Sequence, residues 1–198
     1  MLIDIFYDIL QKAYRNGISI VVTEDDIIKD DVSCCGYFDF TELKLAISTA
    51  YKRSDFLYAF IHESCHMDQW LEKSRAILDA EDPLEDFFYW LGGEEIDIDF
   101  DPFVAAGIIQ NAELDCEIRT VNKLKEWGYK TPRNYVKKAN SYILTYQWMA
   151  KERRWIDFDY EDKRIMEMMP SKFMPLEWYT EPDHKIIEIF NLIGSLDK

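Results

Sequence analysis

Two of the three histidines in the chain stand four residues apart, in the pattern His62-Glu63-Ser64-Cys65-His66. In an α-helix, residues i and i+4 lie on the same face, so both imidazoles can bind one zinc ion through bonds of about 2.0–2.1 Å. Glu63 lies about 100° around such a helix from His62, which favours a role as general base rather than as ligand. The pattern predicts metal-assisted hydrolysis, with Glu63 taking the proton of a water that the zinc activates.

This motif requires a helix, and the surrounding sequence favours one. Ser54 or Asp55 can cap a helix that we expect to continue to about Leu78, with no Gly or Pro inside the motif. A metal-binding helix that is buried on its other faces also needs uncharged neighbours. The residues that flank the two histidines meet this requirement: Ile61, Ser64, Cys65 and Met67.

A catalytic zinc needs a third protein ligand and an open position for water. The remaining histidine, His184, lies far downstream in a polar segment. A better source is the helix that we expect from Pro102 to about Trp127, where Glu113 and Glu117 lie one turn apart. One carboxylate could bind the metal, and the other could accept a hydrogen bond from a zinc-bound imidazole. The residues alone leave open which carboxylate takes which role.

The three motif residues and this glutamate pair resemble the gluzincin branch of the HExxH metallopeptidases. In that branch the third ligand is a glutamate from a later helix, often within an ExxxD arrangement. The segment Glu113-Leu-Asp-Cys-Glu117 is similar to ExxxD, with Glu in place of Asp. The resemblance implies that Glu113 is the third zinc ligand and that Glu117 is the outer partner of an imidazole. It also implies a Zn²⁺ cofactor and hydrolysis of peptide bonds in a protein or peptide substrate.

Within that branch, the order of elements resembles the small ImmA/IrrE-like group, in which a strand, a short loop and the active-site helix follow one another. Here the segment Leu43–Ser48 precedes the motif helix, and the resemblance covers roughly residues 40–120. It implies that Leu43–Ser48 is the sheet edge to which a peptide adds as an extra strand. The donor that stabilises the oxyanion stays open among Tyr142, Tyr146 and His184.

The periodicity of apolar residues predicts an α+β chain that is mostly helical, with a small antiparallel or mixed sheet near its N-terminus. Without a linker or an internal repeat, we expect one zincin-like domain over residues 1–198. The expected strands are Ile18–Val22, Gly36–Phe40 and Leu43–Ser48, the last two forming a hairpin, while Glu24–Asp31 is expected to be a loop. The other expected helices are 2–15, 83–90, 102–127, 132–155 and 183–193.

Composition excludes several classes of protein. With 48% hydrophobic and 15% aromatic residues the chain is too apolar to be disordered, and its net charge of −15 repels nucleic acids and anionic membranes. No apolar run is long enough for a membrane helix, and the first residues lack the features of a signal peptide. Four cysteines without an export signal favour reduced thiols in the cytoplasm.

Two alternatives compete with hydrolysis. The strong negative charge is also typical of a non-enzymatic interaction protein that mimics a polyanion or inhibits a partner by occupying its basic surface. In the other alternative the zinc is bound but serves a structural role or a different hydrolysis. A closed four-ligand shell, for instance with Cys116 as a ligand, would favour a structural role over catalysis.

Overall fold

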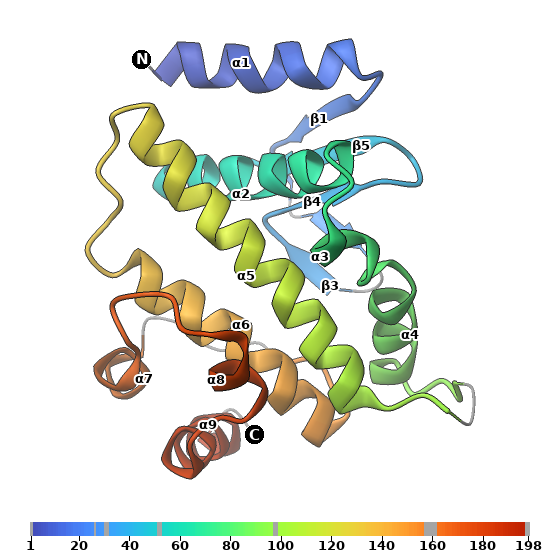
Figure 1. The fold of residues 1–198 in the computed structure, drawn as a ribbon, viewed down its shortest axis with the longest axis vertical. Coiled ribbons are helices and arrows are strands. Elements are labelled where there is room, and N and C mark those ends of the chain that lie inside the picture. Colours follow the sequence, from blue (N-terminus) through green and yellow to red (C-terminus); the bar gives the residue numbers. More distant parts are fainter. Residues whose placement is uncertain are drawn as a thin grey trace. The chain divides into compact units, whose positions relative to one another are not determined.

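The structure is a computed structural model that describes residues 2–25, 27–29, 32–50, 53–96, 99–156 and 162–196. It is 63% helical and contains a small three-stranded mixed sheet near the N-terminus (Figure 1). The expected class, α+β and mostly helical, is therefore confirmed.

The elements follow one another in an order close to the expected one. The strands are β1 (Ser19–Thr23), β2 (Ile27–Lys29), β3 (Val32–Cys34), β4 (Gly36–Asp39) and β5 (Lys44–Ser48). The helices are α1 (Leu2–Arg15), α2 (Arg53–Leu71), α3 (Arg75–Leu78), α4 (Glu81–Leu91), α5 (Pro102–Glu126), α6 (Tyr135–Glu152), α7 (Lys163–Met168), α8 (Leu176–Thr180) and α9 (His184–Leu196). None of the helices in the described ranges is both long and apolar enough to span a membrane.

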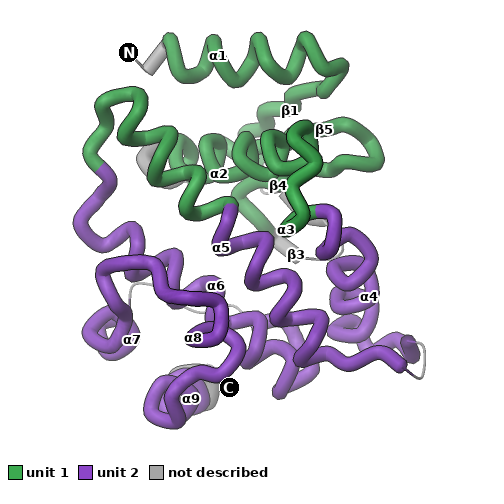
Figure 2. The backbone as a smooth tube through the Cα atoms, in the orientation of Figure 1, with its two compact units in different colours: residues 1–77, 116–130 green, residues 78–115, 131–198 purple. Residues whose placement is uncertain are grey.

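The chain divides into two compact units (Figure 2). The first comprises residues 1–77 and 116–130 and contains the sheet, α1, α2 and the C-terminal part of α5. The second comprises residues 78–115 and 131–198 and is helical in its described residues. The expectation of a single domain over residues 1–198 remains a prediction.

In the first unit the three-stranded sheet has the order β1-β5-β4. β1 pairs with β5 in parallel, and β4 pairs with β5 antiparallel, so the expected hairpin of 36–40 with 43–48 is confirmed. The expectation that Leu43–Ser48 forms the sheet edge is wrong, because β5 lies between two strands and β4 is an edge. The expected loop Glu24–Asp31 is also wrong in part, because Ile27–Lys29 pairs with Val32–Cys34 as a second, two-stranded sheet.

Helix α1 packs against α2 through aromatic rings. The ring of Phe6 stacks on those of Phe56 and Phe60, with centroids 5.7 and 4.9 Å away. The apolar face of α1 also buries Ile5 and Ile9 in the core of this unit. Such stacking adds to the free energy gained by burying the rings themselves. This core supports the helix that carries the histidine motif.

The expected continuation of α2 to Leu78 is wrong. The helix ends at Leu71, and Lys73 takes a left-handed conformation with φ of 53°. The amide of Ser74 then donates to the carbonyl of Gln69 at 2.8 Å, which closes the helix end without a glycine. Left-handed residues are usually Gly or Asn, so the lysine gives no sequence signal for this stop.

The second unit is organised around α6, much of which is buried. Asn140 donates to the carbonyls of Pro170 and Lys172, and its Oδ1 accepts from the Tyr179 hydroxyl at 2.5 Å. Gln110 of α5 donates to the carbonyl of Ile143 at 2.9 Å. These buried amides satisfy two backbone carbonyls between α7 and α8 and one within α6.

Candidate metal centre

The histidine motif lies in the middle of α2, as expected. The residues on its buried faces, expected to be uncharged neighbours of a metal site, have relative exposures of 0%: Ile61, Ser64, Cys65 and Met67. Both histidines are only partly buried. The motif therefore lies on a packed helix whose two histidines face an accessible side.

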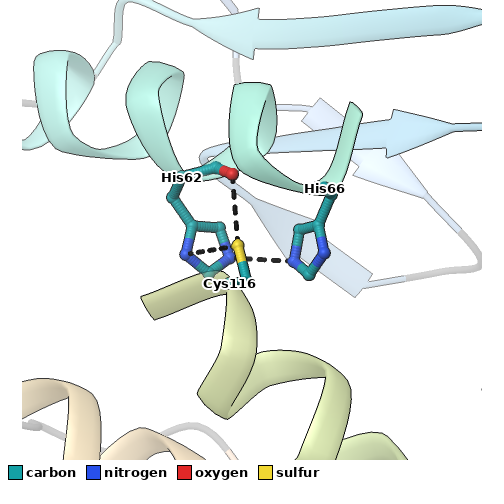
Figure 3. A group of neighbouring side chains, drawn as sticks. All are labelled: His62, His66 and Cys116. Atoms are coloured by element: carbon teal, nitrogen blue, oxygen red, sulfur yellow. Dashed lines mark hydrogen bonds between the residues drawn. The ribbon is translucent and has the colours of Figure 1, made fainter. Parts of the chain in front are cut away.

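The two imidazoles face each other through the same ring nitrogen. The Nε2 atoms of His62 and His66 are 3.2 Å apart, and the rings are nearly perpendicular at 83° (Figure 3). Each Nδ1 lies close to an oxygen acceptor. His62 Nδ1 is 3.2 Å from Glu117 Oε1, and His66 Nδ1 is 2.8 Å from Gln69 Oε1.

These contacts fit a zinc ion. When an acceptor holds the proton of a neutral imidazole on Nδ1, the lone pair lies on Nε2. Two zinc–nitrogen bonds of 2.0–2.1 Å at a tetrahedral angle place the nitrogens about 3.3–3.4 Å apart. The observed 3.2 Å is close to this separation. A cation between the two Nε2 atoms would use both lone pairs, and Glu117 and Gln69 would keep their hydrogen bonds.

Cys116 of α5 completes a group of possible ligands. One ligand atom from each of His62, His66 and Cys116 lies within 4.8 Å of the others (Figure 3). The sulfur also donates to the backbone carbonyl of His62 at 3.3 Å and lies 3.6 Å from its Nδ1. The thiol thus contacts the side of His62 that does not face His66. The arrangement supports two readings of Cys116, as a third ligand and as a residue that packs α5 against α2.

The two candidate glutamates differ in their surroundings. Glu117, in the first unit, is 6% exposed and faces His62, as an outer hydrogen-bond partner would. Glu113 belongs to the second unit, one helical turn earlier in α5, and is 8% exposed. Its Oε1 accepts from the hydroxyls of Tyr146 and Tyr142 at 3.3 and 3.5 Å. Its assignment as the third ligand remains a prediction.

Which side chain would donate to the oxyanion also remains open. The hydroxyls of Tyr142 and Tyr146 lie 2.8 Å from each other, beside Glu113 in the second unit. His184 begins α9, where 83% of its side chain is exposed and its Nδ1 is 3.3 Å from Glu188.

The stem of Glu63, the expected catalytic base, lies close to Gly36 of the edge strand β4. A Cβ atom added to Gly36 would lie 2.7 Å from Ile47 Cδ1, 2.9 Å from the carbonyl oxygen of Ala46 and 3.2 Å from Glu63 Cγ. The missing side chain therefore lets the stem of Glu63 lie directly against the strand. Sequence reasoning placed Gly36 at the start of a strand but missed this contact, because only the packing of α2 on the sheet shows it.

An ion-pair network around the buried Asp68 joins α2 to two other helices. Asp68 lies 2.6 Å from the ammonium group of Lys12 in α1 and 2.8 Å from that of Lys123 in α5. Lys123 also donates to the hydroxyl of Ser64 at 2.9 Å. Burial disfavours the charge of Lys123, but the neighbouring Cys65 and Asp68 keep its pKa above the ordinary value. The sequence shows these charges but not their pairing.

Cys65, inside the motif, is fully buried, and the pKa of its thiol is lowered. Burial alone would raise its pKa, but the hydrogen bond with Cys116, the positive charge of Lys123 and the hydroxyl of Thr120 together lower it to about 6. The Thr120 hydroxyl is 3.5 Å from the sulfur. The buried side of the motif helix therefore carries the Ser64 hydroxyl and the Cys65 thiol among apolar side chains.

No family model, no curated protein and no solved structure matches the chain.

Proposed function

We propose that the protein is a zinc-dependent peptidase whose metal ion is held by His62 and His66. One observation carries this proposal: the two Nε2 atoms face each other at 3.2 Å, while both Nδ1 atoms lie against oxygen acceptors. This is the arrangement of a histidine pair that is ready to bind a tetrahedral cation. Glu113 is the proposed third ligand, on the resemblance of its segment to ExxxD.

When bound, zinc polarises a peptide carbonyl and lowers the pKa of water toward 7. The residues of the chain have separate tasks around it. His62 and His66 hold the ion through Nε2, and Glu117 keeps the proton of His62 on Nδ1. Glu63 accepts the proton of the attacking water and returns it to the leaving amine. Gly36 allows the stem of Glu63 to lie against β4.

The substrate we propose is an extended peptide segment. In the described part of the chain, β4 is an end strand of the three-stranded sheet, so a peptide added beside it would extend that sheet. This edge lies beside Glu63 through the close approach at Gly36. The role first expected of Leu43–Ser48 thus passes to Gly36–Asp39.

A structural zinc site is the second candidate, and the grouping of Cys116 with the two histidines favours it. A thiolate in the shell, together with a fourth protein ligand, would close the site to water. Cobalt substitution separates the two candidates. Under the peptidase proposal, the cobalt spectrum of the wild-type protein has no thiolate-to-metal charge-transfer band, and Cys116→Ser retains zinc. A charge-transfer band that Cys116→Ser abolishes would establish the thiolate site instead.

The peptidase proposal is tested with the zinc-loaded protein and a diverse peptide library, with new termini read by mass spectrometry. We expect zinc-dependent cleavage by the wild type and a loss of about 10²-fold or more in Glu63→Gln, because general bases contribute rate factors of this size. Glu72→Gln removes the same charge from an exposed side chain that contacts Arg119, and should keep full activity. Equal cleavage by wild type and Glu63→Gln would contradict the mechanism.

The proposed compartment is the cytoplasm. All four cysteines carry thiols in the structure, although two are adjacent in sequence and two approach each other in the core. Reduced thiols are typical of proteins kept in a reducing environment.

A further inference from the structure

Gln69 lies on α2, three residues after His66, and is fully buried at 0% exposure. A buried amide side chain loses its contacts with water and must find hydrogen-bond partners inside the protein. The partner of its carbonyl oxygen is His66 Nδ1, at 2.8 Å. This is shorter than the 3.2 Å contact between Glu117 and His62. The better-formed of the two acceptor contacts is thus made by a residue with no expected role.

We infer that Gln69 is a positioning residue for the proposed metal site, which fixes the proton of His66 on Nδ1 and aims its Nε2 at the metal position. An amide oxygen can only accept, so the contact requires that Nδ1 carries the proton. Nε2 of the neutral ring is then the unprotonated nitrogen, and it faces His62. Because Gln69 and His66 share one rigid helix, this tautomer is set before any metal arrives.

The two acceptors divide the work between two helices. Glu117 of α5 orients His62, and Gln69 of α2 orients His66. The neutral amide of Gln69 orients the imidazole of His66 without adding a second negative charge beside the site. Outer hydrogen-bond partners of this kind typically contribute 10–100-fold to metal affinity. Gln69 should contribute an effect in this range although it contacts neither metal nor substrate.

The first test uses metal-free protein labelled with ¹⁵N-histidine, and long-range ¹H–¹⁵N correlations report which ring nitrogen carries the proton. The chain has three histidines, and a His184→Asn background leaves the signals of the motif pair alone. In the wild type we expect His66 to be the Nδ1–H tautomer. In Gln69→Met, which keeps the length of the side chain but lacks the acceptor, we expect the tautomer mixture of an unrestrained imidazole. Gln69→Glu restores an acceptor and should restore the tautomer.

The second test is zinc affinity by competition with a chelator. We expect Gln69→Met to bind about 10–100-fold more weakly than wild type and Gln69→Glu to recover most of the loss. Gln110→Met is the matched control, because it removes another fully buried amide whose bonds go to backbone carbonyls in the second unit. That control should lose stability without losing affinity.

The outcomes separate this inference from the proposed function on which it rests. A wild-type His66 that carries its proton on Nε2, or a tautomer unchanged in Gln69→Met, would overturn the role of Gln69. If Gln69→Met does not fold, the wild-type tautomer and Gln69→Glu still decide the question. If the wild type binds no zinc while His66 is Nδ1–H, the proposed metal site is contradicted. The orientation of His66 by Gln69 would still be established.

Discussion

At the scale of single residues, the candidate site depends on which nitrogen of each imidazole carries a proton. If His62 Nδ1 carries the proton and donates it to Glu117 Oε1, 3.2 Å away, the lone pair of the neutral imidazole lies on Nε2. A carboxylate in this position also makes the imidazole a better electron donor to a metal. Removing the carboxylate should therefore weaken zinc binding even though Glu117 is not a proposed ligand.

We predict that Glu117→Ala lowers zinc affinity about 10–100-fold, and that Glu117→Gln, which retains an oxygen acceptor, lowers it less. Chelator competition at fixed pH measures both. Glu126→Ala, at the exposed end of the same helix, controls for the loss of one negative charge. An affinity in Glu117→Ala equal to that of Glu126→Ala would show that the contact with His62 does not support a metal site.

The sequence predicted the two histidines of the candidate site but not all of their hydrogen-bond partners. Helical spacing is a strict geometric rule, so His62, His66 and the one-turn spacing of Glu113 and Glu117 could be found without a structure. Gln69 could not, because a glutamine three residues from a histidine is common on solvated helix surfaces. Its burial, which depends on the packing of the whole first unit, is what identifies it.

At the scale of elements, α2 is fixed by a sheet on one side and by charged pairs to two helices. The close approach at Gly36 joins β4 to Glu63, and Asp68 joins α2 to α1 and α5 through Lys12 and Lys123. Both contacts act on the helix that carries the motif. Changes at either position should therefore affect the site from a distance.

Gly36→Ala tests the contact between β4 and Glu63. The added Cβ would lie 2.7 Å from Ile47 Cδ1, 2.9 Å from the carbonyl oxygen of Ala46 and 3.2 Å from Glu63 Cγ, so β4 or these neighbours must shift. We expect a loss of about 1–3 kcal/mol in the free energy of unfolding, typical of overpacking, together with reduced peptide cleavage at unchanged zinc content. Urea unfolding and the library assay measure these. Gly92→Ala, at the end of α4, has an ordinary φ of −68° and should leave cleavage intact; equal activity in the two variants would refute the contact's role.

Asp68→Ala tests the ion-pair network of Asp68 with Lys12 and Lys123. The variant leaves the largely buried ammonium of Lys123 without its carboxylate partner, which should cost about 3 kcal/mol of unfolding free energy. Chemical denaturation provides the measurement, with Asp8→Ala on the exposed face of α1 as the control of equal charge. A loss of unfolding free energy no larger than that of Asp8→Ala would mean that the ion-pair network does not stabilise the position of α2.

Elements with strong periodicity were predicted well, and those defined by packing were not. Helices α1, α5 and α6 and the hairpin of β4 with β5 follow from apolar spacing and from Gly and Pro positions. The end of α2 was missed because Lys73, rather than a glycine, adopts the left-handed conformation. The central place of β5 was missed because strand order depends on long-range pairing with β1, which short-range patterns do not encode.

At the scale of the whole molecule, the two compact units have separate apolar cores. The expected class is confirmed, but the division of α5 between the units has no sequence signal, because the helix continues across it. His62, His66, Glu117 and Gln69 all belong to the first unit. Zinc bound to the two imidazoles should therefore stabilise the first unit directly.

We predict that zinc raises the unfolding free energy by about 2.7 kcal/mol when free zinc is one hundred times its dissociation constant. Hydrogen exchange should slow in α2 and in residues 116–126 of α5. Thermal unfolding and exchange mass spectrometry, with and without a chelator, report these effects. His66→Ala should abolish both. A zinc effect that persists in His66→Ala would place the metal elsewhere in the chain.

The proposed site holds one zinc ion between the Nε2 atoms of His62 and His66. Anomalous diffraction at the zinc edge, from crystals of the zinc-loaded protein, tests it directly. We expect a single strong peak about 2.0–2.1 Å from each Nε2, with Glu117 and Gln69 still contacting the Nδ1 atoms. A crystal with no peak between the two histidines, or with zinc bound through the Nδ1 side of His62, would contradict it.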